Sequence, residues 1–449
     1  MGYLLKNKAA LRQLLEENGQ GKKKRPIEYR SLRFDNHTSP PSLKEVKAFL
    51  AKALSLEDRD EAINSLDFFS DGLSPHAYSQ KALSDIELSK KAIKKALGLE
   101  AVFTSSPKPS IESLDDEMGL YDQVILTSSG AEAVCQVHFS TYMEDTRSSG
   151  KNHILIPEGS PAVFCRSLER LEPLGVVAKF IKTSPKGLCI DSFLEVVSHR
   201  TALVSLSTAD SLTGALEPIE EIAKICRSKH IPLHIDITPS IGKQWLDFEA
   251  LDADMITFCG KALGSPFPIG ALILKRGALF APLIMGDLSQ EGLRAGGISA
   301  PLFKSLEIAL EKAIELQNHM AMEVASLKNQ MLDDLRKNER FTLFTPNMSA
   351  LPNAFAFGFS GIKGELLAYA LGQRGIFVSM GGGSLPSLQR LLELKGICPI
   401  EAATAVSISL TTEISLEEIK YATQIVLEEV ERLSSLFPNS SASEKRLLL

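Results

Sequence analysis

The feature that most constrains the fold is a repeated order of short apolar runs and amphipathic helical patterns between residues 120 and 275. Each run is short, as strands are, and each following pattern spaces its apolar residues at helical intervals. Such alternation is typical of a mostly parallel sheet with helices on both faces. The runs followed by helical patterns are 124–126, 153–156 and 202–206, and a further run covers 233–236.

Two later apolar runs, 255–258 and 270–274, lie close together in the sequence. A helical crossover between parallel neighbours needs about a dozen residues or more, whereas antiparallel strands can be joined by a short turn. We therefore predict a tight loop between these two strands.

The chain divides into four parts by its patterning. Residues 1–30 carry an N-terminal helical pattern and a linker, and residues 31–300 hold the large α/β domain. Residues 301–437 form a smaller α+β domain that opens with a long helix, and residues 438–449 are a loose tail. The last helix of the smaller domain is expected to start at Ser415, where Glu418 completes a capping box. The long helix carries Leu302, Leu306, Leu310, Ala313, Met320, Val324 and Leu327 on one stripe.

Composition excludes several classes of protein. Hydrophobic residues make up 44% of the chain and charged residues 23%, which is typical of a globular protein and not of a disordered one. A formal net charge of −6 argues against general nucleic-acid binding, because that needs a basic face. No uncharged run approaches the ~20 apolar residues of a membrane-spanning helix. The six cysteines lack metal or secretory spacing, so we expect reduced core thiols, no metal site and a cytoplasmic location.

Asp236 and Lys261 are the pair of residues best suited to chemistry. Asp236 ends one apolar run and Lys261 follows a later one, so both are expected at the carboxyl edge of the sheet, where open α/β sheets bind ligands. A pyridinium cofactor needs such a pair, because a carboxylate keeps the ring nitrogen protonated and a lysine binds the aldehyde as a Schiff base. The alternative is that Asp236 only caps a turn and Lys261 is exposed.

Residues 127–133 supply a third element of this site. The sequence Thr127-Ser128-Ser129-Gly130-Ala131-Glu132-Ala133 lies between a predicted strand and a predicted helix, where free backbone amides and the helix dipole favour an anion. We expect Ser129, Gly130 and Ala131 to bind a phosphate. Small residues also occur in tight turns before helices for conformational reasons alone, so that alternative stays open.

Taken in order, these motifs resemble those of the NifS-type cysteine desulfurases of the class V aminotransferase family, from about residue 31 to 425. Ser129-Gly130-Ala131 resembles the phosphate loop, and His234-Ile235-Asp236 resembles the strand that bears the pyridinium partner. Lys261, followed by Gly264 and residues 269–272, is similar to the Schiff-base lysine and the strand after it. The other similar segments are Phe34-Asp35-Asn36-His37-Thr38-Ser39-Pro40, Ser74-Pro75-His76, Ile241-Gly242-Lys243 and Gln290-Glu291-Gly292-Leu293-Arg294-Ala295-Gly296.

The resemblance implies a fold-type I transferase or lyase that depends on pyridoxal 5′-phosphate. Its large domain would hold a mostly parallel seven-stranded sheet, and a small α+β domain would follow. Lys261 would be the catalytic lysine, Asp236 would bind the ring nitrogen, and Ser160 and Ser211 fall at positions that contact the ring. The resemblance also implies an amino-acid substrate, a homodimer and a sulfur-acceptor protein. Arg294 is expected either near the cofactor at the dimer interface or in a structural ion pair.

The chain departs from the family at positions that contact the cofactor or the substrate. Gly260 stands where the family has a histidine, and Pro239 stands where it has a glutamine. Ser160 replaces a histidine that stacks on the ring, and Ser211 replaces an asparagine. Ser407 replaces an arginine that would bind the substrate carboxylate in a bidentate manner, which a serine cannot do.

The position of the family's catalytic cysteine is Ser384, in the glycine-rich loop 379–384. Persulfide formation needs a thiolate, so we expect no standard desulfurase turnover there. Cys398 is the nearest other thiol, and we expect it to be buried and structural. Two functions stay open: an enzyme that uses Asp236 and Lys261, and a catalytically degenerate scaffold or regulatory subunit.

Overall fold

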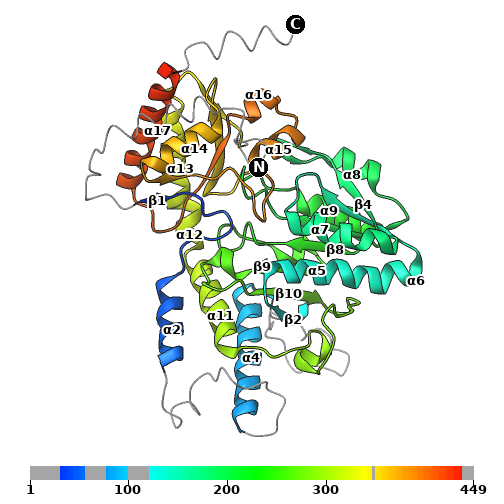
Figure 1. Ribbon diagram of the computed structural model, residues 1–449. Helices are drawn as coiled ribbons and strands as arrows, with labels where there is room; N and C mark the ends of the chain where they lie inside the picture. The colour runs from blue at the N-terminus through cyan, green and yellow to red at the C-terminus, as the bar shows by residue number, and fades with distance from the viewer. Residues whose placement is uncertain (1–30, 56–76, 100–120, 346–348, 437–449) are drawn as a thin grey trace, which may run out of the picture.

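The computed structural model describes residues 31–55, 77–99, 121–345 and 349–436 (Figure 1). The predicted N-terminal helix and linker, the segment 74–76 and the predicted tail lie outside the described residues. The described chain forms two units with separate hydrophobic cores, and α11 (Ala300–Glu315) runs from the larger unit towards the smaller one.

A seven-stranded sheet forms the centre of the larger unit, in the order β2-β10-β9-β8-β7-β3-β4. Its strands are β2 (Tyr121–Thr127), β3 (His153–Pro157), β4 (Val177–Ile181), β7 (Thr201–Ser207), β8 (Leu233–Asp236), β9 (Met255–Cys259) and β10 (Gly270–Lys275). Only β10 runs antiparallel to its neighbours, β2 and β9, and the other pairs of this sheet are parallel. The mostly parallel seven-stranded sheet is thereby confirmed, and so is the absence of a helical crossover between the strands of 255–258 and 270–274.

The two faces of the sheet enter two different cores, because successive side chains of a strand point to opposite sides. Ile154 and Ile156 of β3 pack with α5 (Gly130–Thr141) and α7 (Ala162–Leu171), whereas Leu155 lies in the core of the other face. That other core includes apolar side chains of α2 (Lys44–Ser55), α4 (Ala77–Ala96), α8 (Ile190–Val196), α9 (Ile219–Ser228) and α11. Helices therefore cover both faces, and the carboxyl ends of the parallel strands are left to hold a site.

The smaller unit is built on a three-stranded antiparallel sheet. Its strands are β11 (Phe341–Leu343), β12 (Ala354–Phe359) and β14 (Val406–Ser409), and its main helices are α13 (Ala325–Leu335), α14 (Gly364–Gln373) and α17 (Leu416–Leu436). The predicted capping box is confirmed: Ser415 N donates to Glu418 Oε2 at 2.9 Å, and Glu418 N donates to Ser415 Oγ at 3.2 Å.

The predicted long helix is interrupted between the two units. α11 ends at Glu315, and the short α12 (Gln317–His319) and a π-helical turn (Met320–Val324) lead into α13. Leu306 packs in the core of the larger unit, whereas Val324 packs in that of the smaller unit. The single apolar stripe predicted from the sequence therefore serves two cores.

The first described residues belong with the smaller unit in the structure. β1 (Leu32–Arg33) pairs with β13 (Ile376–Phe377), and Leu32 and Phe34 lie in the second core, although the sequence placed them with the large domain. The remaining short elements are α6 (Arg147–Ser149), β5 (Thr183–Ser184), β6 (Gly187–Leu188), α10 (Phe248–Leu251), α15 (Leu388–Leu394) and α16 (Pro399–Ala402).

The expectation that the cysteines are core thiols is confirmed for Cys226, and Cys165 packs partly buried against a core, but the expectation is wrong for Cys398. All six are free, but only Cys226 is buried, and Cys398 is exposed where it precedes α16. The apolar neighbours of Cys398 misled the prediction, because a residue that starts a short surface helix need not face the core. No helix within the described ranges is both long and apolar enough to cross a membrane; the cytoplasmic location stays a prediction.

Candidate cofactor site

Asp236, Lys261 and Gly130 lie at the carboxyl ends of β8, β9 and β2 of the seven-stranded sheet. In the parallel pair β8 and β9, Asp236 is in register with Thr257, and Lys261 lies in the 3-10 turn directly after β9. β2 is parallel to β9, since both are antiparallel to β10, and it leads into α5 at Gly130. A Cβ atom on Gly130 would lie 2.7 Å from Cys259 Cβ, so the loop before α5 contacts the end of β9.

Asp236 offers one carboxylate oxygen to a ligand. Its Oδ1 accepts hydrogen bonds from Thr238 N at 3.1 Å and from Thr238 Oγ1 at 2.5 Å. Its Oδ2 has no hydrogen-bond partner among the described residues. Burial raises the pKa of Asp236 to about 6, against the lowering effect of these hydrogen bonds. A cationic ring nitrogen at Oδ2 would stabilise the ionised form.

Lys261 is exposed, as the alternative in the sequence analysis had it, and its side-chain amine makes no hydrogen bond or ion pair with another described residue. Gly260 before it is buried, and a Cβ there would lie 2.5 Å from Leu306 Cδ1 and 3.2 Å from the carbonyl oxygen of Ile269. The histidine that the family places before its lysine therefore does not fit unless α11 moves. Tight packing of α11 on the turn accounts for glycine at this position.

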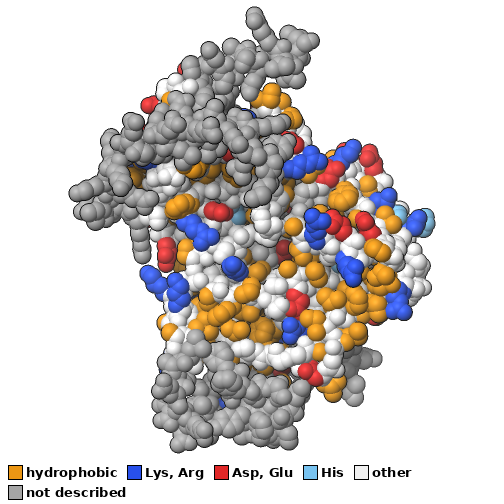
Figure 2. Space-filling view, in the orientation of Figure 1, with side chains coloured by type: hydrophobic (Ala, Val, Ile, Leu, Met, Phe, Trp, Pro, Cys, Tyr) orange, Lys and Arg blue, Asp and Glu red, His pale blue; other side chains and the backbone are white. Residues whose placement is uncertain are grey.

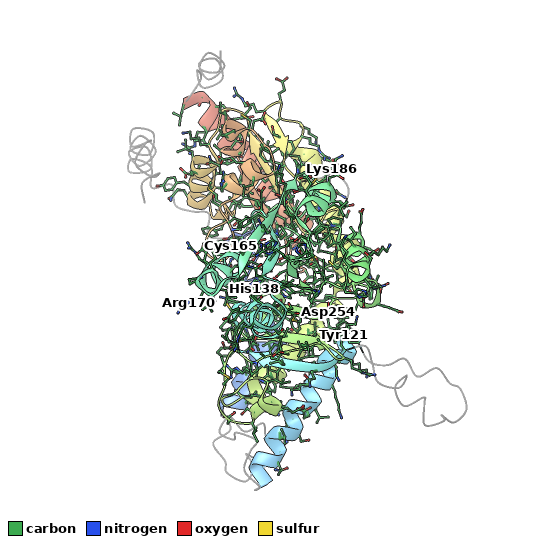
Figure 3. All side chains as sticks on the ribbon, turned by 90° about the vertical axis from the view of Figure 1, so that its right-hand side faces the viewer. Tyr121, His138, Cys165, Arg170, Lys186 and Asp254 are labelled. Atoms are coloured by element: carbon green, nitrogen blue, oxygen red, sulfur yellow. The ribbon has the colours of Figure 1, made fainter. Side chains whose placement is uncertain are left out.

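A chain of buried hydrogen bonds reaches from the helix layer to the strand beside Asp236. Ser167 of α7 lies 2.6 Å from His138 of α5 (Figure 3), and His138 lies 2.9 Å from Ser205 of β7. Ser205 lies 2.8 Å from His234 of β8, and His234 lies 2.9 Å from Thr257 of β9. Burial lowers the pKa of His138 to about 3, and burial together with His138 lowers the pKa of His234. Both imidazoles are therefore neutral at neutral pH.

The direction of each hydrogen bond in this chain follows from its first member. Ser167 Oγ donates to the carbonyl of Val163 at 2.7 Å, so it must accept from His138 Nδ1. The bare Nε2 of His138 then accepts from Ser205, which in turn accepts from His234 Nδ1. Thr257 must donate to His234 Nε2. The proton of Thr257 is thus committed to His234, and its 3.5 Å contact with Asp236 is the weaker alternative.

Ser160 and Ser211 come together at a cavity between the ends of β3 and β7, which Ser207 also lines. Ser160 Oγ donates to the carbonyl of Pro157 at 2.7 Å, and Ser207 Oγ is buried with no partner among the described residues. The exposed Ser384 lies beside this cavity, because its carbonyl accepts a hydrogen bond from the backbone amide of Ala162 at 2.9 Å. The structure therefore brings three of the predicted site residues close to one another.

Three charged residues of the same cavity were missed by the sequence analysis. Lys395 Nζ, which is almost fully buried, lies 3.2 Å from Asp210 Oδ2, and Glu217 also lines the cavity. Burial raises the pKa of Glu217 to about 7, more than the nearby Lys395 lowers it. Asp210 precedes Ser211 after a strand and could have been noticed there. Nothing in the sequence marks Lys395, which the fold brings in from the segment after α15.

The position of the family's carboxylate-binding arginine is filled by a neutral network. Ser407 is fully buried, and its Oγ donates to the carbonyl of Leu212 at 2.6 Å. His37 donates from Nδ1 to the carbonyl of Ser211 at 2.7 Å, and its Nε2 lies 3.0 Å from Ser407 Oγ. Burial lowers the pKa of His37 to about 4, so neither side chain carries a positive charge at neutral pH.

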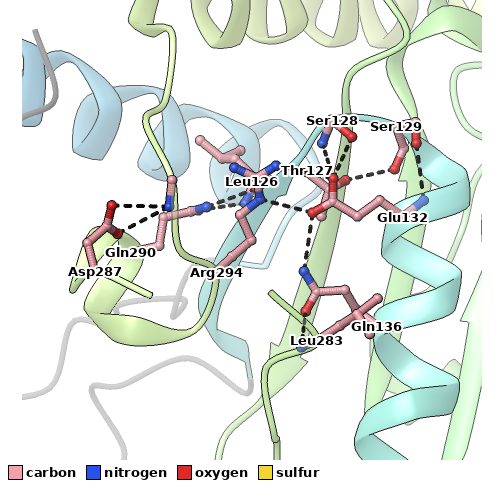
Figure 4. Close-up of polar contacts among 11 residues, drawn as sticks. Leu126, Thr127, Ser128, Ser129, Glu132, Gln136, Leu283, Asp287, Gln290 and Arg294 are labelled. Atoms are coloured by element: carbon pink, nitrogen blue, oxygen red, sulfur yellow. Dashed lines mark hydrogen bonds and ion pairs between the residues drawn. The ribbon is translucent and has the colours of Figure 1, made fainter. Parts of the chain in front are cut away.

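The loop before α5 has the amides of an anion site, but a carboxylate already lies beside them. Ser129 caps the helix, since its Oγ accepts from Glu132 N at 3.1 Å, and the amides of Gly130 and Ala131 donate to no other described residue. The carboxylate of Glu132 forms an ion pair with Arg294 at 2.9 Å (Figure 4). Arg294 thus makes the ion pair that was one of the two predicted alternatives, and its position near a bound cofactor stays a prediction.

A pyridoxal phosphate cofactor fits the ring side of this site. Asp236 presents a free carboxylate oxygen, Lys261 presents an unpaired amine among the described residues, and Ser207 presents an unpartnered hydroxyl. On the phosphate side, the amides of Gly130 and Ala131 donate to no other described residue, and the nearby carboxylate of Glu132 is paired with Arg294.

Comparison with known proteins agrees with this fold. The sequence profile described as aminotransferase class-V matches residues 119–422, and the chain belongs to that family. Among curated relatives, the chain is 26% identical over 372 residues to a cysteine desulfurase of Bradyrhizobium diazoefficiens, covering 81% of this chain and 88% of the relative. It is 29% identical over 301 residues to a cysteine desulfurase of Nostoc sp., covering 64% of this chain and 73% of the relative.

Solved structures of NifS-like proteins share the fold. One, titled NifS-like protein, matches with a TM-score of 0.76 at 21% identity and covers 90% of this chain and 100% of that chain. A NifS-like protein from Rickettsia africae matches with a TM-score of 0.73 at 19% identity and covers 90% of this chain and 100% of that chain. The chain therefore shares the fold of NifS-like proteins, which is that of a fold-type I pyridoxal phosphate enzyme.

Proposed function

We propose that this chain is a pyridoxal phosphate-dependent enzyme of the cysteine desulfurase type, which acts on an amino-acid amine at Lys261. The observation that carries the proposal is the common position of Asp236, Lys261 and the loop at Gly130 at the carboxyl ends of three strands. The carboxylate is partly buried and has a free oxygen, and the lysine amine has no competing partner among the described residues. Ligands of open α/β sheets bind at this edge.

Each residue has a distinct task in the proposed site. Pyridoxal phosphate supplies an electron sink when it is bound. Lys261 would hold the cofactor covalently and, once released by the substrate amine, would move the proton of the substrate α-carbon. Asp236 would keep the ring nitrogen protonated, and Ser160 and Ser211 would face the ring side. The amides of Gly130 and Ala131 would face the phosphate.

Sulfur transfer is the step for which the predicted nucleophile loop offers no thiol. Ser384 is exposed in the loop that should carry the nucleophile, and a hydroxyl is too weakly acidic to accept sulfur from the substrate. Neutral Ser407 and His37 give no charge for a substrate carboxylate. We therefore infer that the substrate is an amine other than cysteine or that desulfuration is very slow.

The second candidate is a catalytically degenerate scaffold or regulatory subunit. It is favoured by internal contacts at positions where the family has functional groups: Leu306 packs against Gly260, and His37 lies beside Ser407. Such a protein would retain the fold and the dimer surface without turnover.

A homodimer is part of both proposals. Leu279, Met285 and Leu288 have exposed fractions of 67%, 73% and 78%, and they precede the segment that resembles the family's dimer interface. Figure 2 shows hydrophobic side chains gathered on one face of the larger unit, in the region where Figure 1 draws β10 and α11. Sedimentation of the full chain should give a dimer, and Met285→Asp should weaken it. A monomeric wild type would remove the dimer from the proposal. A sulfur-acceptor protein rests on the resemblance alone.

Cofactor attachment is the deciding test. Purified protein should be yellow, and borohydride should fix the cofactor to Lys261, as peptide mass mapping would reveal. Lys261→Ala should be colourless, whereas Lys224→Ala, which removes an exposed lysine of α9, should remain yellow. Wild type that binds no pyridoxal phosphate would favour the scaffold.

Sulfide release from cysteine tests the inference about Ser384. Wild type with bound cofactor should release little sulfide, and Ser384→Cys should raise the release, because the variant supplies a thiolate in the same loop. Cys398→Ala is the control, since Cys398 is an exposed thiol near the loop in sequence. Rapid release that survives Cys398→Ala would show that Ser384 does not mark the nucleophile position.

A further inference from the structure

The cavity between the ends of β3 and β7 carries more negative than positive charge. Among the described residues, its lining holds the carboxylates of Glu158, Asp210 and Glu217 but the ammonium group of Lys395 alone. Asp210 and Lys395 form an ion pair at 3.2 Å, and Lys395 is almost fully buried. Glu158 and Glu217 are then left without a cation of their own in this lining.

The ion pair of Asp210 and Lys395 is fully engaged within the fold. Asp210 Oδ1 accepts a hydrogen bond from Leu212 N at 2.9 Å, and its Oδ2 accepts one from Thr213 Oγ1 at 2.8 Å. The carboxylate therefore fixes the turn after β7 and also neutralises Lys395, which follows α15. This pair joins segments from two sides of the cavity, and it leaves no free positive charge for an acidic ligand.

Glu217 has one carboxylate oxygen that the fold does not use. Its Oε2 accepts a hydrogen bond from Leu188 N at 2.6 Å, whereas its Oε1 has no hydrogen-bond partner among the described residues. The contact with Leu188 needs only an acceptor, which a neutral glutamine would also supply, so it does not explain a charged group. Burial raises the pKa of Glu217 to about 7, more than the nearby Lys395 lowers it. A cation bound at Oε1 would stabilise the ionised form.

Glu158 is the second carboxylate of the cavity that lacks a partner. It directly follows β3, where its backbone amide donates to the carbonyl of Ile181 at 2.9 Å, and it is partly exposed. No described residue forms a hydrogen bond or ion pair with its carboxylate. A cavity with two unpaired carboxylates attracts a cation and repels an anion.

The cavity adjoins the proposed cofactor site. Ser207 lines it and is the partner of Asp236 in the register of β7 and β8. Neighbouring strands lie about 4.8 Å apart, so a substrate held beside Asp236 can extend its side chain into the cavity. The hydroxyl groups of Ser207 and Thr183, both lining residues, are buried without a partner among the described residues. Such groups are uncommon in folded proteins, so they independently indicate a polar ligand here.

We propose that this cavity is the side-chain pocket of the proposed enzyme and that Glu158 and Glu217 bind a positively charged group there, so that the preferred substrate is an amino acid with a second basic nitrogen on its side chain. The inference rests on the proposed function, because it names the substrate class of that site. Glu217 binds the charged nitrogen at Oε1, and Glu158 adds a second negative charge. An acidic side chain is disfavoured, because Lys395 is already paired with Asp210.

Two ligands that differ in this charge test the inference. The reduced conjugates of pyridoxal 5′-phosphate with the α-amine of L-lysine and of L-norleucine share the ring and the carbon chain, and the lysine conjugate adds a terminal ammonium group. Neither has the aldehyde that reacts with Lys261, so equilibrium dialysis with the cofactor-free full chain measures non-covalent binding. The lysine conjugate should bind at least about tenfold more tightly, since opposite charges attract strongly in a partly buried site.

Variants of the two carboxylates locate the preference. Glu217→Gln, which keeps an acceptor for Leu188, should weaken the lysine conjugate by at least about fivefold and leave the norleucine conjugate unchanged. Glu158→Gln should act in the same direction, and the double variant should bind both conjugates equally. Glu221→Gln is the control, because it removes the same charge from an exposed position of α9 and should change neither affinity. Glu158→Gln carries the test if circular dichroism shows that Glu217→Gln does not fold.

The outcomes separate this inference from the proposed function. Equal binding of the two conjugates to wild type, or a lysine preference that survives in the double variant, would overturn the role of the cavity even if borohydride labels Lys261. Binding of neither conjugate, with Lys261 unlabelled, would contradict the proposed function and this inference with it. A lysine preference that is lost with Glu158 and Glu217 supports the inference.

Discussion

Replacing Asp236 by asparagine should stabilise the cofactor-free protein above about pH 6 and weaken cofactor binding. Burial raises the pKa of Asp236 from 3.8 to about 6, so the folded state holds this proton more tightly than the unfolded state. As the pH rises from about 4 to above about 6, the folded state loses stability relative to the unfolded state, because the folded chain must then hold an ionised carboxylate in a partly buried position. A rise of roughly two units at about 1.36 kcal/mol per unit corresponds to about 3 kcal/mol. This is an upper bound, since the side chain keeps some contact with solvent.

Urea denaturation of the cofactor-free protein at a series of pH values measures this effect. The difference in the free energy of unfolding between Asp236→Asn and wild type should be near zero at about pH 4 and should reach about 2–3 kcal/mol at about pH 8. Asparagine can still accept the hydrogen bonds that Thr238 donates to Oδ1. A variant that is less stable than wild type at about pH 8, or a difference that does not change with pH, would refute the reasoning.

Three other sets of changes test the packing and the polar networks by the same denaturation assay. Ser205→Ala removes the hydroxyl between two buried imidazoles and should lower the free energy of unfolding by about 2–4 kcal/mol. Ser240→Ala is the control, because the buried hydroxyl of Ser240 has no partner among the described residues, and it should cost less than about 1 kcal/mol. Equal losses in the two variants would contradict the chain of hydrogen bonds. Gly260→Ala should lower the free energy of unfolding by about 1–3 kcal/mol, because the new methyl group would contact Leu306. The double variant Gly260→Ala with Leu306→Ala should lose less stability than the sum of the two single variants. Strict additivity would show that the two side chains do not clash. Glu217→Gln should stabilise the protein by up to about 3 kcal/mol above about pH 7 and should have no effect near pH 4, because burial raises the pKa of Glu217 to about 7. A gain in stability that is independent of pH would show that the raised pKa of Glu217 is not its cause.

The sheet and its helices could be predicted from the sequence because their signals are local. A strand such as β3 alternates between two apolar cores, and its short apolar run is visible in a few consecutive residues. The spacing of Ser415 and Glu418 likewise defines a helix start within four residues. The order of Gly130, Asp236 and Lys261 after successive strands was sufficient to predict that they share one edge.

The polar partners in the site could not be predicted in this way. Glu132 and Arg294, or Ser407 and His37, are brought together only by the complete fold, and no periodic pattern relates their positions. Lys395 was missed because its partner Asp210 lies in the other unit. Asp236 itself gave no sign of how far it would be buried, since burial depends on elements that pack from elsewhere in the chain.

The balance between enzyme and scaffold depends on Asp236 more than on the missing groups. Two departures from the family are filled by internal contacts, Leu306 against Gly260 and His37 beside Ser407, and a scaffold would gain stability from such contacts. Asp236 is different, because its buried carboxylate costs stability above about pH 6 and its Oδ2 bonds to no described residue. A group that destabilises the cofactor-free fold and offers a free oxygen in a site is typical of a ligand-binding role. If the scaffold hypothesis is right, Asp236→Asn should gain stability and lose nothing; if the enzyme hypothesis is right, the same variant should gain stability and lose the yellow colour.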